Sequence, residues 1–269
     1  MADLREADLF GSLEQQQNHW YYHAKLSAIR SALQRSKQRI PCTGVGLAAL
    51  DIGAGNGIIS RSLPLDPHGQ PWRWWLVDTG YSNRDLHNCE PGYTLLRHPP
   101  DHQLFDLIVA IDVVEHVSDD AGFMRDLSCR LRPGGLLIAC VPAFRFLWSR
   151  HDVVLGHCRR YRRGGFARLI QASGLQLLSS TYLYILLFPL VLFRRLLSGS
   201  EQERSDLAIY PGPVNRSLRW VMALERRLER VVPAFGRLPG LSCLVVAIRP
   251  TVDAQSPSPA CADEEDRWR

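Results

Sequence analysis

Three glycines occupy alternate positions in the stretch LAALDIGAGNGIIS, directly behind an acidic residue that ends an apolar run. Gly53, Gly55 and Gly57 lie between this run and a segment of helical character, so the context is strand, turn and helix. Glycine has no Cβ atom, which frees the backbone and lets a ligand lie against the main chain. Position 58 holds Ile58 instead of the glycine of a dinucleotide site, and the carboxylate of Asp51 repels phosphate. The pattern favours a ligand that carries an ammonium group; a tight turn without a ligand is the alternative.

Candidate acids and bases follow the later apolar segments. Asp78 ends the segment WRWWLVD, and Glu115 and His116 stand at the exit of FDLIVAIDVVEHV. The segment HDVVLGHCRRYRR carries His157 and several arginines, among them Arg160. His116 and His157 are candidates for a general base, because an unperturbed imidazole titrates near neutrality. Two other interpretations remain open: Glu115 and His116 hydrogen-bond to neighbouring loops, and the arginines form a solvated face.

The elements that must position these residues alternate between apolar strands and helices, which is typical of βαβ units around a parallel sheet. A helical segment with apolar spacing at Leu26, Ile29 and Leu33 comes first, and further helices are expected at 123–131, 165–173 and 215–232. The expected strands lie at 46–52, 73–78, 93–97, 105–111, 134–141, from 175 onward and at 242–248.

The order and separation of these blocks resemble class I S-adenosylmethionine (SAM) dependent methyltransferases over residues 47–142. The resemblance implies a Rossmann-like fold: a seven-stranded, mostly parallel sheet with an antiparallel last strand, N-terminal helices and a helical insertion before that strand. It also implies SAM as cofactor and S-adenosylhomocysteine as product. Asp51 would hold the methionine end and Asp78 the ribose hydroxyls, while no acid clearly fills the adenine position. The implied cofactor residues are Asp51, Gly53, Ala54, Gly55, Gly57, Asp78, Thr79, Leu96, Ile111 and Asp112.

Segments outside this core resemble the flanking blocks of a mostly uncharacterised bacterial subgroup of these enzymes, which widens the match to most of the chain. The DVVEH block also resembles the Glu-x-x-Glu-His segment of ubiquinone-biosynthesis O-methyltransferases, some of which bind a divalent cation there. That resemblance implies a magnesium site at Asp112, Glu115 and His116, a minor alternative to a site without metal.

The apolar run YLYILLFPLVLF, residues 182–193, is too short to span a bilayer and has two interpretations. Packed inward it is a lid over an apolar acceptor site, which we favour; packed outward it is an in-plane membrane anchor. Pro189 is expected to kink its helix. The residues expected to contact the acceptor are Trp148, His151, Arg160, Tyr161 and Tyr184.

Five regions are expected along the chain. They are an N-terminal helical cap at 1–40, a SAM-binding core at 41–181, an apolar and helical insertion at 182–240, the last core strand at 241–250 and a disordered tail at 251–269. The seven cysteines are widely spaced without a CxxC pair, and the N-terminus lacks an apolar signal core, so a cytoplasmic protein is expected, with or without peripheral contact to the inner membrane face.

The expected function is methyl transfer from SAM to an oxygen or nitrogen atom of a small to medium, partly apolar or aromatic metabolite. The alternative is a protein that binds SAM without methylating, either a cofactor-assisted cyclase or a silent subunit. Nucleic acid is not an expected partner, because the net charge is only +5 and the Asn/Asp-Pro-Pro-Tyr/Phe tetrapeptide is absent from the sequence.

Overall fold

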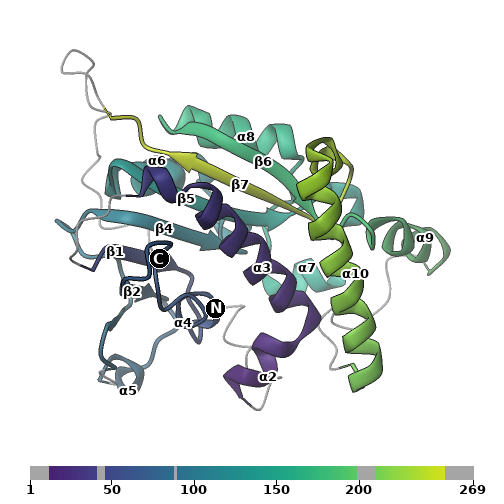
Figure 1. Ribbon diagram of the computed structural model, residues 1–269, viewed down its shortest axis with the longest axis horizontal. Helices are drawn as coiled ribbons and strands as arrows, with labels where there is room; N and C mark the ends of the chain where they lie inside the picture. The colour runs from purple at the N-terminus through teal and green to yellow at the C-terminus, as the bar shows by residue number, and fades with distance from the viewer. Residues whose placement is uncertain (1–11, 41–45, 88–89, 199–209, 252–269) are drawn as a thin grey trace.

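A seven-stranded sheet forms the centre of the computed structural model, which describes residues 12–40, 46–87, 90–198 and 210–251 (Figure 1). The strand order is β3-β2-β1-β4-β5-β7-β6. Neighbouring strands are parallel from β3 to β5, and β7 is antiparallel to both β5 and β6, which confirms the expected topology. The strands are β1 Ala48–Ile52, β2 Arg73–Val77, β3 Tyr93–Leu96, β4 Phe105–Ile111, β5 Leu131–Pro142, β6 Gln176–Leu183 and β7 Ser242–Ile248.

Both faces of the sheet are covered by helices, which is why the central strands are almost wholly apolar. Every residue of β4 is buried, and its alternate side chains belong to two separate hydrophobic clusters. Leu107, Val109 and Ile111 face one cluster, while Ile108 and Ala110 face the other. The helices are α2 Leu13–Asn18, α3 Trp20–Arg35, α4 Ile58–Arg61, α5 Asn83–Leu86, α6 Asp120–Arg130, α7 Arg150–Leu155, α8 Arg163–Ala172, α9 Phe188–Ser198 and α10 Gly212–Val231, with short 3-10 turns at Lys37–Arg39, Val114–His116, Arg145–Leu147 and Pro233–Arg237.

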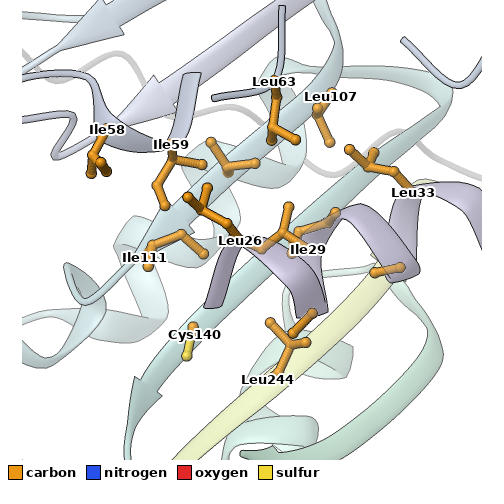
Figure 2. Close-up of a cluster of buried hydrophobic side chains, with 14 of the residues drawn as sticks. Leu26, Ile29, Leu33, Ile58, Ile59, Leu63, Leu107, Ile111, Cys140 and Leu244 are labelled. Carbon is orange, nitrogen blue, oxygen red and sulfur yellow. The ribbon is translucent and has the colours of Figure 1, made fainter. Parts of the chain in front are cut away.

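Helix α3 packs on the first face of the sheet through the expected apolar positions. Figure 2 shows Leu26, Ile29 and Leu33 of α3 pointing into a cluster with Leu107 of β4 and Leu244 of β7. Helix α10 packs beside α3, while α6 and α8 cover the opposite face. The N-terminal helix is therefore part of the core, and it brings its own side chains to the ends of the parallel strands.

The apolar run at 182–193 does not form a single helix. Strand β6 takes its first residues and ends at Leu183, Tyr184 then adopts a left-handed backbone with φ 59°, and α9 begins only at Phe188. Pro189 therefore lies in the first turn of α9, where a missing N–H removes no intrahelical hydrogen bond. The expectation that Pro189 kinks the helix is wrong for this reason.

No helix among the described residues is both long and apolar enough to cross a membrane. The expected region boundaries stay predictions. Residues 252–269 of the expected tail, 1–11 of the expected cap and 199–209 of the expected insertion lie outside the described residues.

Candidate functional site

The glycine turn connects β1 to α4 in the predicted place. Gly53, Gly55 and Gly57 all have positive φ, at 69°, 54° and 76°, a region that other residues enter only with strain. A Cβ atom on Gly53 would lie 1.9 Å from Cγ2 of Val113, and one on Gly57 would lie 2.7 Å from Cδ2 of Leu76. The backbone conformation of the turn and its packing against Val113 and Leu76 therefore require glycine at both positions, independently of any bound ligand.

Asp78 ends β2 beside this turn and is only 4% exposed. Its carboxylate accepts hydrogen bonds from the backbone N–H of Gly55, at 3.0 Å, and of Gly80, at 2.8 Å. The N–H of Asp78 donates to the carbonyl of Leu96 at the end of β3, at 3.1 Å, and Thr79 beside it is exposed. Because parallel strands end at the same edge of the sheet, Asp78, Leu96 and the glycine turn meet there.

A cleft opens beside the turn, between the sheet edge and α3. Its lining combines five of the expected cofactor residues with side chains of α3 and α4: Asp51, Gly53, Ala54, Ile111 and Asp112 together with Tyr22, Lys25, Ile58 and Ile59. Asp51 is 2% exposed and accepts a hydrogen bond from the N–H of Ser60 at 3.2 Å. The contribution of α3 was missed in the sequence, although Lys25 stands beside Leu26 and four residues before Ile29, at the spacing of buried positions.

Lys25 is a buried cation at one wall of this cleft, with a side chain only 1% exposed. Its ammonium group forms an ion pair with Asp112 and donates a hydrogen bond to the hydroxyl of Tyr21 at 2.5 Å. The Tyr21 hydroxyl in turn donates to the Asp112 carboxylate at 3.2 Å, and its ring lies 4.3 Å below the ammonium nitrogen. Asp112 has φ 55°, a strained backbone conformation for a residue other than glycine. The contacts of its carboxylate with Lys25 and Tyr21 on α3 hold it in this conformation.

Tyr184 connects the helical insertion to this wall. It is 1% exposed, its ring stacks on Tyr21 with centroids 5.3 Å apart, and its hydroxyl donates to the Tyr21 carbonyl at 2.8 Å. The carboxylate of Glu225 on α10 accepts hydrogen bonds from the N–H groups of Tyr184, at 2.7 Å, and Leu186, at 3.0 Å. Burial raises the pKa of Glu225. Its position on α10 explains how the left-handed turn after β6 is maintained.

A histidine and an aspartate form a pair on and just after α7. Nδ1 of His157 lies 2.8 Å from Oδ1 of Asp152, which is fully buried. The carboxylate also accepts hydrogen bonds from Nε of Arg160 at 2.6 Å and from the N–H of Ser149 at 2.8 Å. Burial alone would raise the pKa of Asp152, but the hydrogen bonds from His157 and Arg160 outweigh it and hold the pKa well below its usual range. An ionised Asp152 accepts a hydrogen bond from Nδ1–H of His157, and in the tautomer that makes this bond the lone pair of a neutral imidazole is on Nε2.

His116 lies against His157, with ring centroids 4.7 Å apart and planes at 78°. Burial, aided by the neighbouring His157, lowers the pKa of His116 to about 4, so its imidazole is neutral at pH 7. The two histidines that sequence analysis selected as candidate bases are therefore brought together by the fold. The two histidines are more than 40 residues apart in the sequence: His116 follows β4, and His157 follows α7 on the connection after the adjacent strand β5. The carbonyl of Glu115 accepts the N–H of Cys158 at 2.7 Å across this junction.

Glu115 is the third member of this cluster. Its side chain is fully buried, and neither carboxyl oxygen has a hydrogen-bond partner in the part of the chain that the structure describes. Burial raises the pKa of Glu115 to about 8, so the group is mostly protonated at pH 7. One ligand atom each of Glu115, His116 and His157 lie within 4.8 Å of one another.

The cluster differs from the magnesium site that the resemblance implied at Asp112, Glu115 and His116. The Asp112 carboxylate is engaged by Lys25 and Tyr21, and His157 takes its place beside Glu115 and His116. Two imidazoles and one carboxyl fit Mg²⁺ poorly, because that ion prefers oxygen ligands in an octahedral arrangement.

Two of the remaining residues expected to contact an acceptor, Arg160 and Tyr161, have side-chain polar atoms that are hydrogen-bonded within the protein. Both Nε and Nη2 of Arg160 donate to Asp152, and the hydroxyl of Tyr161 donates to Asp120 at 2.8 Å. Trp148 is half-buried just before α7, and its carbonyl accepts a hydrogen bond from Arg195 at 3.4 Å; His151, in the first turn of α7, is also half-buried. Their contact with an acceptor stays a prediction.

The seven-stranded sheet with its antiparallel β7 and helices on both faces defines a Rossmann-like α/β fold. A family model described as a methyltransferase domain matches residues 19–180, more than half of the chain. The chain therefore belongs to this family of class I SAM-dependent methyltransferases.

Curated relatives agree with this assignment. The chain is 32% identical over 139 residues to a ubiquinone biosynthesis O-methyltransferase of Methylobacterium sp. strain 4-46, covering 45% of this chain and 52% of that protein. It is 34% identical over 136 residues to the protein of the same name from Caulobacter sp. strain K31, with the same coverage. The chain thus spans about half the length of the curated relatives it matches.

A solved structure supports the fold alone. A putative sarcosine dimethylglycine methyltransferase from Galdieria sulphuraria superposes with a TM-score of 0.51 at 11% identity, over 84% of this chain and 86% of that one.

Proposed function

We propose that this protein transfers the methyl group of SAM to an oxygen or nitrogen atom of a small to medium, partly apolar or aromatic metabolite, with His157 as the general base. The observation that carries this proposal is the Asp152–His157 pair, in which the carboxylate engages Nδ1 of the imidazole and Nε2 would serve as the basic nitrogen. The name of the curated relatives, ubiquinone biosynthesis O-methyltransferase, supports an oxygen acceptor on an apolar molecule.

SAM would be held along the edge of the sheet where the glycine turn, Asp51 and Asp78 lie. The cleft offers carboxylates for the ammonium group of its methionine part, and Lys25 places a cation at the same wall. Ala54, Ile111 and Asp112 line the same cleft, while Gly55, Gly57, Thr79 and Leu96 follow the same edge toward β3. SAM supplies an electrophilic methyl carbon on a sulfonium; all other steps fall to the side chains of this protein.

Methyl displacement needs an aligned acceptor and removal of a proton from it. Nε2 of His157 would take that proton, and the ionised Asp152 would stabilise the imidazolium that forms. His116, neutral at pH 7, is the second candidate base and contacts the His157 ring. Trp148, His151 and Tyr161 lie near this pair in sequence and would contribute walls of the acceptor pocket, and Tyr184 would support it through Tyr21.

Calorimetric titration with S-adenosylhomocysteine tests the cofactor assignment without knowledge of the acceptor. The wild type is expected to show saturable binding. The dissociation constants of His157→Ala and of the control His87→Ala should agree with the wild-type value within about twofold, because a general base acts on the acceptor and not on the cofactor. His87 is an exposed histidine directly after α5, hydrogen-bonded to the carbonyl of Asn83. A screen of lipophilic phenols, acids and amines for S-adenosylhomocysteine release then identifies an acceptor.

With that acceptor, His157→Ala should lower turnover by about 10² or more while His87→Ala leaves it unchanged. Equal turnover in the two variants would remove His157 as the base. Binding of S-adenosylhomocysteine without methyl uptake across the whole screen would instead favour the alternative, a SAM-binding protein that does not methylate.

A further inference from the structure

Helix α10 exposes an apolar stripe to solvent. Trp220 is 71% exposed, Leu224 51% and Val231 80%. At about 100° per residue these three positions fall on one side of the helix. The side chains that α10 buries point another way and include two charged groups: Met222, Glu225 and Arg226. The helix therefore keeps charged residues in the protein interior and presents aromatic and aliphatic residues to the outside.

The exposed surface of α10 around this stripe is basic. The helix carries two acidic residues, of which Glu225 is buried and Glu229 forms an ion pair with Arg226 at 2.6 Å. Three of its five arginines are exposed: Arg216, Arg227 and Arg230. A partner that complements this surface must offer negative charge together with an apolar layer.

Helix α9 adds a second exposed apolar pair nearby. Leu190 is 65% exposed and Phe193 is 61% exposed, and the adjacent Arg194 is exposed as well. The hydrogen bond from the N–H of Leu186 to Glu225, at 3.0 Å, ties the approach to α9 directly to α10. In Figure 1 both helices stand at the end of the molecule away from β2 and α5, with α9 outermost.

We propose that α10, assisted by α9, binds the surface of a bilayer that contains anionic lipid. Trp220, Leu224 and Val231 would enter the boundary between headgroups and acyl chains, and the flanking arginines would meet lipid phosphates. A lipid bilayer can accommodate exposed apolar residues on two separate helices, because its surface is continuous and deformable. A second copy of the chain would bring the same arginines against one another, which costs free energy. The docking does not depend on which acceptor is methylated.

Flotation of the full chain with vesicles tests this inference, using phosphatidylcholine with and without phosphatidylglycerol. We expect binding only where phosphatidylglycerol is present. The double variant Trp220→Ser/Leu224→Ser should bind at least about tenfold more weakly. The matched control Leu65→Ser/Leu104→Ser removes two leucines, 53% and 40% exposed, from outside α9 and α10, and should bind like the wild type.

The charge component is measured separately. Arg227→Gln and Arg230→Gln should each weaken binding about fivefold, and added salt should weaken the wild type in the same direction. Quenching by brominated lipids should be lost in Trp220→Phe, because that indole is expected at the boundary. Retained affinity for S-adenosylhomocysteine shows that each variant is folded.

Results of two kinds would overturn the inference. The first is equal vesicle binding by Trp220→Ser/Leu224→Ser and the wild type, or no binding to phosphatidylglycerol at all. The second is a wild-type dimer, seen by light scattering, that Trp220→Ser/Leu224→Ser dissociates, because the stripe would then belong to an interface between two copies of the chain.

Discussion

Asp152→Asn isolates the buried carboxylate that organises the candidate site. In the folded chain this carboxylate is fully buried and accepts hydrogen bonds from His157, Arg160 and the backbone of Ser149. The Arg160 side chain is itself only 9% exposed. Replacing Asp152 by asparagine keeps the shape but removes the negative charge, and it leaves the guanidinium buried without its counterion.

Breaking a buried ion pair from one side costs about 3 to 5 kcal/mol, so the free energy of unfolding should fall by that amount. The matched control is Asp126→Asn, which makes the same chemical change in the i,i+4 pair with Arg130 on α6. That pair is partly exposed, and such helix pairs contribute about 0.3 to 0.5 kcal/mol. Urea unfolding of both variants and the wild type at pH 7 gives the two differences.

The pH dependence of the free energy of unfolding tests the same carboxylate independently. Folding lowers the pKa of Asp152 below its ordinary value of 3.8, so the stabilisation is present above pH 3.8 and is lost as the pH falls through the lower, folded-state pKa. The difference in unfolding free energy between the wild type and Asp152→Asn should therefore shrink as the pH falls below 3.8. If Asp152→Asn costs no more than Asp126→Asn, or if its cost does not change with pH, the reasoning about this carboxylate is refuted.

Three further predictions address the glycine turn, the buried acid and the cofactor edge. Gly53→Ala should destabilise the fold by about 1 to 3 kcal/mol more than Gly69→Ala, because both sites have positive φ but only Gly53 faces Val113. In a double-mutant cycle, Val113→Ala should reduce this difference in unfolding free energy. Equal costs for the two glycine substitutions would contradict the packing argument. The raised pKa of Glu115, about 8, means that the folded chain holds a proton that the unfolded chain has released. The stability of the wild type should therefore fall as the pH rises from about 4.5 to about 8, and urea unfolding of Glu115→Gln should show a flatter profile over that range; matching profiles would exclude a buried titrating carboxyl. Asp78→Ala should weaken S-adenosylhomocysteine binding by about 1.5 to 3 kcal/mol in calorimetry, and unchanged affinity would take Asp78 out of the site.

The positions of the strands along the chain and the glycine turn could be predicted from local pattern, because each depends on short-range physics. Strand β4 is a continuous apolar run bounded by polar residues, which is typical of a strand buried on both faces. The turn at Gly53 needs a left-handed backbone that glycine alone adopts without strain. The edge where Asp51 and Asp78 meet follows from the parallel arrangement, since both residues stand at strand ends.

The local pattern failed where a residue's surroundings came from elsewhere in the chain. Pro189 was expected to kink a helix, but β6 extends through Leu183 by pairing with β7, so the helix begins late and the proline lies in its first turn. Lys25 reads as one basic residue in an amphipathic helix, and only the packing of α3 on the strand ends places it against Asp112.

Residue type and spacing in the sequence by themselves indicated alternating strands and helices, the glycine turn and the two candidate histidines, and the resemblance to class I SAM-dependent methyltransferases implied the class of fold and the edge proposed for the cofactor. The tertiary structure decided which groups pair. It joined His116 to His157, gave His157 its Asp152 partner, and buried Glu115 without a hydrogen-bond partner among the described residues. Such pairings depend on which loops meet at the ends of β4 and β5, and burial then shifts each pKa through desolvation and neighbouring charges.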